Sequence, residues 1–400
     1  MTTATQTPAA TTAEGHLDPA ARLADAAFVP VQTRSERPTS YAPADFGTPT
    51  GREVNWKHTP LDRLRPLLVD EPAPHGVIEV SVSAPAGVEQ RRLAPGEAPR
   101  GEVFRPDDVI AAVAWSQEAE APLIRIPAGV ELDEPVVVRI NGTGGLAHAH
   151  IVIEAEAHAR GTVVLRHEGT AQQAQNVEII ARDGSALTVI TLQRWDDDTV
   201  HAASHQARVD RDATLTHIVI TLGGGVVRVN PSVELAGAGA VGRLYGLSFA
   251  DAGQHFESQV YLHHKGPHTV GDVLYKGALQ GEKAHSVWIG DVLIGPDATG
   301  TDSYEANRNL VLTEGARADS IPNLEIETGD IVGAGHASAT GRFDDEQLFY
   351  LQARGIAEDE ARRLVVLGFL TEIVQKTGIP ALEAELIAAI EEELAQGVPA

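Results

Sequence analysis

The sequence Asp183-Gly184-Ser185-Ala186 is a turn of small residues, and the run Leu187-Thr188-Val189-Ile190-Thr191-Leu192 follows it directly. The run is rich in β-branched residues and lacks helical spacing, so it predicts a short strand. The same combination recurs where Arg211-Asp212-Ala213-Thr214 precedes His217-Ile218-Val219-Ile220. Short strands joined by tight corners of small residues are typical of stacked β-structures.

The combination extends in both directions along the chain. Further β-rich runs occupy residues 135–140, 150–153, 162–165 and 177–180, and no helical pattern separates them. If the turn residues Ala159, Ser185, Ala213, Gly239 and Ala316 are equivalent, their spacings are 26, 28, 26 and 77, the last close to three periods of 26. A steady period of this size predicts a β-solenoid, in which each turn stacks on the previous one. A β-sandwich is the alternative, and it requires alternation but no steady period.

The flanking segments have a different texture. Residues 1–15 are rich in Thr and Ala and predict a disordered tail. A short helix is predicted over residues 18–28, with Asp18 as its N-cap and Pro19 at its first position. We therefore divide the chain into the tail, a mixed and partly helical region over 16–105, the solenoid over 106–341 and a helical region over 342–400. Start and stop signals in the last region predict helices over 344–354, 358–376 and 381–396. We expect these helices to cap the end of the repeat region.

The composition excludes several classes of protein. The chain of 400 residues has 31 basic and 56 acidic residues, a net charge of −25, which disfavours nucleic acid and anionic membrane surfaces as partners. It contains no cysteine, which excludes a disulfide scaffold, a thiolate nucleophile and a cluster held by its own thiolates. The segment Met1–Pro8 has no basic or apolar part typical of a secretory signal, so we expect a cytoplasmic protein.

Several ordered motifs between residues 53 and 356 resemble those of one protein family. They are Glu53…Trp56-Lys57-His58-Thr59, Asn307-Arg308-Asn309-Leu310, Ile321-Pro322-Asn323-Leu324-Glu325-Ile326, the turn Gly335-His336-Ala337-Ser338-Ala339-Thr340-Gly341, and the helix Glu346-Gln347-Leu348-Phe349-Tyr350-Leu351…Arg354-Gly355-Ile356. Together they resemble the SufB/SufD family, the core subunits of the SUF machinery that assembles iron–sulfur clusters. The similarity extends over nearly all of residues 50–375.

This resemblance implies a fold, a function and partners. In the family, a right-handed parallel β-helix lies between N-terminal and C-terminal helical regions. The SufB branch carries a cysteine that holds the nascent cluster, so this cysteine-free chain resembles the SufD branch. The resemblance implies a non-enzymatic subunit that pairs with SufB through the ends of the β-helices, while the SufC ATPase binds the C-terminal helices. A homodimer in the absence of SufB is left open by the sequence.

The resemblance also singles out His336. In the family this motif histidine faces the cluster-holding cysteine of SufB, so His336 becomes a candidate ligand of iron or of a transient cluster shared with SufB. Imidazole binds ferrous iron and replaces thiolate on some clusters. Many family members have a cysteine two residues before this histidine, where this chain has Ala334. The alternative is a structural histidine in a turn. The family has been associated with reduced flavin, but no flavin site is recognisable here.

Other candidate residues favour structural roles. The pairs His201/His205 and His148/His150 lie in strand-like sequence, and His263, His264 and His268 suggest a cluster in a loop. The run Asp196–Asp198 is typical of a solvated turn, Gly223–Gly225 lacks the residues of a phosphate loop, and Trp56 suggests a packing anchor.

The C-terminal helices carry more apolar residues than one packing face needs. The set is Leu348, Phe349, Leu351, Leu364, Val365, Leu367, Phe369 and Ile373. Part of it is therefore a candidate docking surface for the ATPase. Two rival functions remain: a polysaccharide-active solenoid enzyme, and a purely structural subunit without a metal ligand.

Overall fold

The computed structural model describes Arg34 and residues 37–73, 78–343 and 345–396. The tail over 1–15 and the helix expected over 18–28 lie outside the described residues.

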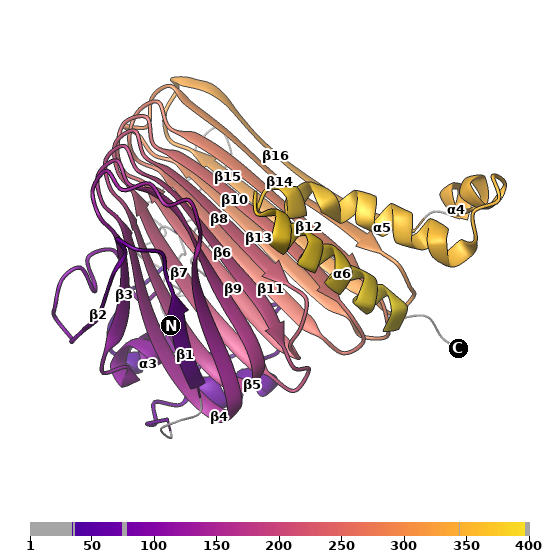
Figure 1. Ribbon diagram of the computed structural model, residues 1–400, viewed down its shortest axis with the longest axis horizontal. Coiled ribbons are helices and arrows are strands. Elements are labelled where there is room, and N and C mark those ends of the chain that lie inside the picture. The colour runs from indigo at the N-terminus through magenta and orange to yellow at the C-terminus, as the bar shows by residue number, and fades with distance from the viewer. Residues whose placement is uncertain (1–33, 35–36, 74–77, 344, 397–400) are drawn as a thin grey trace, which may run out of the picture.

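Most of the chain forms a parallel β-solenoid (Figure 1), as the sequence predicts. The long strand β5 (Arg160–Ala181) pairs with β6 through its first half and with β7 through its second half. From there the chain alternates between two parallel sheets, which we call the even sheet and the odd sheet after their strand numbers. The even sheet continues through β6 (Ala186–Trp195), β8 (Thr214–Thr221), β10 (Val241–Ala250), β12 (Val270–Leu279), β14 (Thr301–Val311) and β16 (Ile331–Arg342). The odd sheet continues through β7 (Val200–Val209), β9 (Val226–Leu235), β11 (His255–His264), β13 (His285–Ile294) and β15 (Arg317–Ile326).

The first turns of the solenoid are formed by β3 (Ala121–Ile126) and β4 (Val136–Ala155), which pair in parallel with each other, and β4 also pairs in parallel with β5. Two short strands, β1 (Ile78–Ser83) and β2 (Glu89–Leu93), add to them in antiparallel orientation.

The corners form two rows, and this corrects the expected equivalence of the turn residues. Ala159, Ser185 and Ala213 lie in one row, where the next equivalent residue is Ala240 rather than Gly239. Ala316 belongs to the opposite row, because the following Arg317 pairs with His285 in the odd sheet. The period is not constant either. Paired residues on adjacent turns are 26 positions apart near the start of the solenoid, as in Gly161 and Leu187, and 32 positions apart near its end, as in His285 and Arg317. The number of residues per turn therefore increases along the chain.

An apolar core fills the space between the two sheets. Inward-facing Val, Ile and Leu side chains from successive strands pack into one continuous cluster that reaches from Ile124 to Val311. Small residues are needed at the corners because the strands of adjacent turns lie only about 4.8 Å apart. Ala159, Ala213 and Ala240 are fully buried there.

The N-terminal region covers the outer face of the odd sheet. Its helices are η2 (Pro43–Asp45), α2 (Leu61–Leu64), η3 (Arg65–Leu68) and α3 (Val109–Gln117), where η denotes a 3₁₀ helix. The Asp108 side chain caps α3 by accepting a hydrogen bond from the backbone N–H of Ala111 at 2.9 Å. Trp56 and Val113 are buried against Ala202 of the odd sheet. Helix α3 lies inside the range that the sequence predicts as solenoid, and the first parallel strand begins at Ala121.

The C-terminal region consists of the three predicted helices, α4 (Asp345–Gln352), α5 (Glu358–Gln375) and α6 (Pro380–Gln396). Their predicted position as an end cap is wrong. Leu370 of α5 and Leu386 of α6 are buried against Ile218 and Leu247, so both helices lie on the outer face of the even sheet (Figure 1). Outward-facing Ile and Leu residues on that sheet require such a cover, and an end cap cannot supply it.

In the described part of the chain, the position of the helices leaves the last turn of the solenoid uncovered. The strands β15 and β16 are the two ends of the sheet path, and Val332 of β16 is 74% exposed. Among the described helices, none is long and apolar enough to cross a lipid bilayer.

Candidate functional site at the open end of the solenoid

His336 lies in the middle of β16 rather than in the predicted turn. Ala334, two residues earlier in the strand, packs against the core between the sheets, so the alternation of side chains directs His336 towards the same interior. Its side chain is nevertheless 45% exposed. The exposure follows from its place in the terminal strand of the even sheet.

Glu305 lies directly below His336, one turn earlier in the solenoid. The two residues are paired in register between β14 and β16, and His336 Nδ1 is 3.8 Å from Glu305 Oε1. The Glu305 side chain is only 1% exposed. Burial raises the pKa of its carboxyl to about 8, and the negative charge of Asp291 adds to the increase. Glu305 was not predicted from the sequence, because it lies 31 residues before His336, whereas the predicted period of the solenoid is 26 residues.

A pocket of about 410 Å³ adjoins His336. Its walls include Tyr261, Asp291 and Glu325, and Arg34 also lines it. Arg34 is paired with Asp107 at 3.2 Å, so part of its charge is already neutralised. The pocket therefore places a histidine beside carboxylates at the exposed end of the solenoid.

An imidazole nitrogen and a carboxylate oxygen at this separation are suitable ligands for a divalent transition metal. In the described part of the chain, no group of three or more His, Asp or Glu side chains is arranged to hold a metal ion. The pair at the open end therefore offers an incomplete ligand set, which needs further ligands from water or from another chain.

His201 and His205 lie on strand β7, as predicted, and face the solenoid interior. His201 accepts a hydrogen bond from Trp195 Nε1 at 2.8 Å, and His205 Nδ1 lies 3.0 Å from His217 Nε2. Burial lowers the pKa of His167 and His217 to about 4. Burial, followed by the charges of neighbouring histidines, holds the pKa of His201 and His205 well below its usual value. These four histidines are consequently neutral core residues at pH 7.

The expected loop cluster of His263, His264 and His268 is not formed. The first two residues end strand β11, and only His268 lies in a corner. His264 is buried and lies 2.8 Å from Thr269 Oγ1, while His268 is exposed. His148 and His150 both lie in β4, and His150 Nε2 faces the buried carboxylate of Glu178 at 3.4 Å.

The remaining candidates have structural positions. Asp196–Asp198 form a corner in which Thr170 Oγ1 donates to Asp196 at 2.9 Å. In Gly223–Gly225 the glycines are required by close backbone contact, because a Cβ on Gly223 would lie 2.4 Å from the Trp195 carbonyl oxygen. Trp56 is 4% exposed and stacks beneath the Arg228 guanidinium at 4.3 Å, which confirms its role as a packing anchor.

Arg228 is also the centre of a buried ionic cluster that the sequence analysis missed. Its guanidinium pairs with Asp108 at 2.7 Å and with Glu257 at 3.0 Å, which ties the N-terminal region to the odd sheet. Burial acts to raise the pKa of Glu257, but the hydrogen bond with His255 and the charge of Arg228 lower it to about 2. Because the three charged partners come from distant segments, no local pattern could reveal the cluster.

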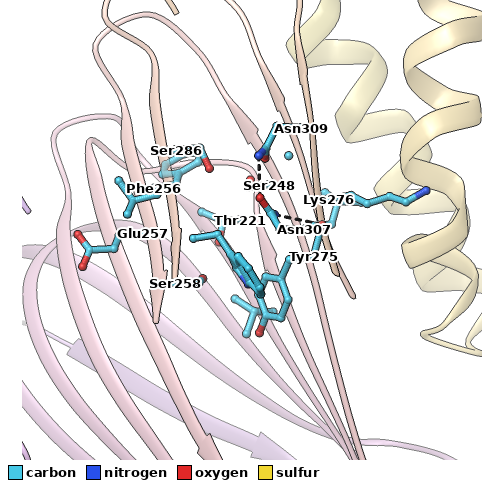
Figure 2. Close-up of a pocket in the computed structure, with 15 residues that line it drawn as sticks. Thr221, Ser248, Phe256, Glu257, Ser258, Tyr275, Lys276, Ser286, Asn307 and Asn309 are labelled. Atoms are coloured by element: carbon cyan, nitrogen blue, oxygen red, sulfur yellow. Dashed lines mark hydrogen bonds between the residues drawn. The ribbon is translucent and has the colours of Figure 1, made fainter. Parts of the chain in front are cut away.

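The solenoid interior also contains a small cavity (Figure 2), of about 20 Å³. In Figure 2 the Asn309 amide donates to Asn307 at 2.7 Å, and the Asn307 amide donates to the Tyr275 carbonyl at 3.2 Å. A cavity needs roughly 10–15 Å³ to hold one water molecule. This one therefore has room for a buried water molecule and is too small for a substrate.

Comparison with known proteins agrees with the fold and the motifs. Residues 138–369 match the family model described as the SUF system FeS cluster assembly, SufBD core domain. An iron–sulfur cluster assembly SufBD family protein of Mycobacterium tuberculosis (strain ATCC 25618 / H37Rv) is 48% identical over 87% of this chain and 90% of its own length. The corresponding protein of Mycobacterium leprae is 47% identical over 87% of this chain and 91% of its own length. The iron–sulfur cluster assembly protein SufB of Bacillus subtilis is 27% identical over 66% of this chain and 58% of its own length.

The fold is a parallel β-solenoid, and the family match places the chain in the iron–sulfur cluster assembly class. The chain belongs to the SufBD family.

Proposed function

We propose that this chain is the cysteine-free, SufD-like subunit of a SUF assembly complex, and that it pairs with a SufB-like subunit through the open end of its solenoid. The observation that carries the proposal is the partly exposed His336 on the terminal strand of a chain without cysteine. A nascent cluster needs thiolates, which this chain cannot supply, so a partner has to provide them. Membership of the SufBD family favours this role over a polysaccharide-active solenoid.

The terminal strands support pairing at that end. A terminal strand exposes unpaired backbone N–H and C=O groups, and proteins usually cover such edges. Ile326 of β15 is 43% exposed and Val332 of β16 is 74% exposed, so apolar side chains lie beside the unpaired backbone. A second solenoid stacked on this end would cover both, and it would bring its ligands next to His336.

The C-terminal helices supply the surface proposed for the SufC-like ATPase. Phe349 is 71% exposed, Tyr350 is 55% exposed and Leu364 is 42% exposed, on α4 and the first half of α5. Other apolar residues of α5, such as Leu370 and Ile373, pack on the even sheet. Exposed aromatic and leucine side chains on a helical surface are suited to a groove in a partner. In this role the chain catalyses no reaction itself, and it acts in the cytoplasm, where ATP is available.

Anaerobic co-expression with the SufB-like and SufC-like proteins of the same organism tests the proposal, with purification through this chain alone. We expect both partners to co-purify in a stable ratio. Recovery of this chain alone, as a monomer or homodimer, would refute the partnership. Cluster yield in the purified complex then tests His336: His336→Ala should lower it, whereas the exposed, distant His158→Asn should not.

A further inference from the structure

In the described part of the chain, the Glu305 carboxyl group lies 3.8 Å from the His336 ring but accepts no short hydrogen bond. Both of its oxygens are buried and neither has a hydrogen bond. Burying an unpaired carboxylate is costly, and buried polar groups in native proteins nearly always have a partner. A buried, inward-facing carboxyl group without a hydrogen bond at the open end of a fold therefore leaves a position for a cation or donor that arrives from outside.

The neighbouring His336 lies where a shared cation would place it. A metal ion forms bonds of about 2.0–2.2 Å to imidazole nitrogen and to carboxylate oxygen. A single ion can consequently bridge His336 Nδ1 and Glu305 Oε1, which are 3.8 Å apart. The in-register pairing of β14 with β16 holds the two side chains one above the other.

The surroundings leave room for the carboxylate and favour a positive charge. A Cβ on Gly290 would lie 2.4 Å from Glu305 Oε2, so the glycine creates the space that the carboxylate occupies. Asp291 and Glu325 line the adjoining pocket together with Arg34, whose charge is partly neutralised by Asp107, so acidic groups outnumber basic groups there.

We propose that Glu305 is a second ligand beside His336, and that the pair binds a single ferrous ion before it enters a cluster. The inference rests on the proposed function and adds a ligand residue and a substrate form to it. One imidazole and one carboxylate are ligands typical of mononuclear ferrous iron, whereas assembled clusters are held mainly by thiolates. The open coordination positions are left to water and to the partner subunit.

The test is an anaerobic titration of the full chain with Fe²⁺ against a ferrous-specific chelating dye. We expect one Fe²⁺ per chain, and a loss of affinity of at least about tenfold in both Glu305→Gln and His336→Gln. Glu327→Gln is the matched control, because Glu327 is an exposed glutamate near the same end of the solenoid, and it should bind Fe²⁺ as the parent does. Fe²⁺ should raise the melting temperature of the parent and of Glu327→Gln, but not that of Glu305→Gln.

Two results would overturn the inference: a parent chain that binds no stoichiometric Fe²⁺, or Glu305→Gln with the affinity of the parent. A circular dichroism spectrum identical to the parent's verifies that Glu305→Gln is folded. Co-purification with the partners is measured without added Fe²⁺, so the two claims can fail separately. If both partners co-purify while Glu305→Gln binds Fe²⁺ normally, the proposed function stands and the ligand role of Glu305 is refuted.

Discussion

Acid should destabilise this solenoid through its interior histidines, and His217 allows the effect to be isolated. Burial lowers the pKa of His217 to about 4, against about 6.5 in an unfolded chain. As the pH falls, the unfolded state thus binds the proton first. The contribution of the neutral histidine to the free energy of unfolding is therefore complete above pH 6.5 and is lost as the pH falls towards 4. The shift corresponds to a loss of about 2 kcal/mol between pH 7.5 and pH 5 for this residue alone.

Urea denaturation of His217→Gln and of the parent, repeated at several pH values, measures this contribution. The amide of glutamine can still donate to His205 Nδ1, which lies 3.0 Å from the His217 ring, but it does not titrate. We expect the parent to lose about 2 kcal/mol more than the variant between pH 7.5 and pH 5. The exposed His158→Asn should follow the parent. If His217→Gln and the parent lose stability in parallel, the reasoning about the neutral histidine core is wrong.

Three further outcomes follow from the packing. Leu370→Ala should lower the free energy of unfolding by about 2–5 kcal/mol, measured by urea denaturation, because Leu370 is fully buried between α5 and the even sheet. Arg228→Met should lower the free energy of unfolding by about 3–5 kcal/mol in the same assay, because it leaves the buried Glu257 without its cation. A loss of less than about 1 kcal/mol would contradict the described cluster. The double substitution of Phe349 and Leu364 by Ser should weaken co-purification of the ATPase while leaving the melting temperature within about 2 °C, because both side chains are exposed.

The fold class could be predicted from the sequence because each strand carries its own local signal. The run Leu187–Leu192 and the turn before it are local, and stacking repeats them along the chain. The exact period could not be predicted, since corners of both rows contain the same small residues. Ala316 therefore resembled Ala159 although the two lie in opposite rows.

The placement of the C-terminal helices depends on contacts between distant segments. Their boundaries follow from local signals, and α5 begins at Glu358 as predicted. Their packing surface follows from the outward-facing side chains of the even sheet, such as Ile218 and Leu247, which become recognisable as outward-facing only once the register is known.

The candidate site was predictable only in part. His336 was identified from a motif, but its position in a strand, its exposure and its partner Glu305 depend on which strands are adjacent in the solenoid. A glutamate in a β-rich segment has no local feature that separates a buried ligand from a surface charge.

The absence of cysteine permits a direct test of the central claim, that the open end binds the SufB-like partner. Val332→Cys creates a single thiol on the exposed terminal strand, and Val80→Cys creates one at the opposite end, on β1, where Val80 is 42% exposed. Each variant is labelled with a thiol-reactive photocrosslinker before anaerobic mixing with the SufB-like protein. The account predicts a covalent adduct with that protein from Val332→Cys and none from Val80→Cys. An adduct from Val80→Cys alone, or from neither position, would contradict it.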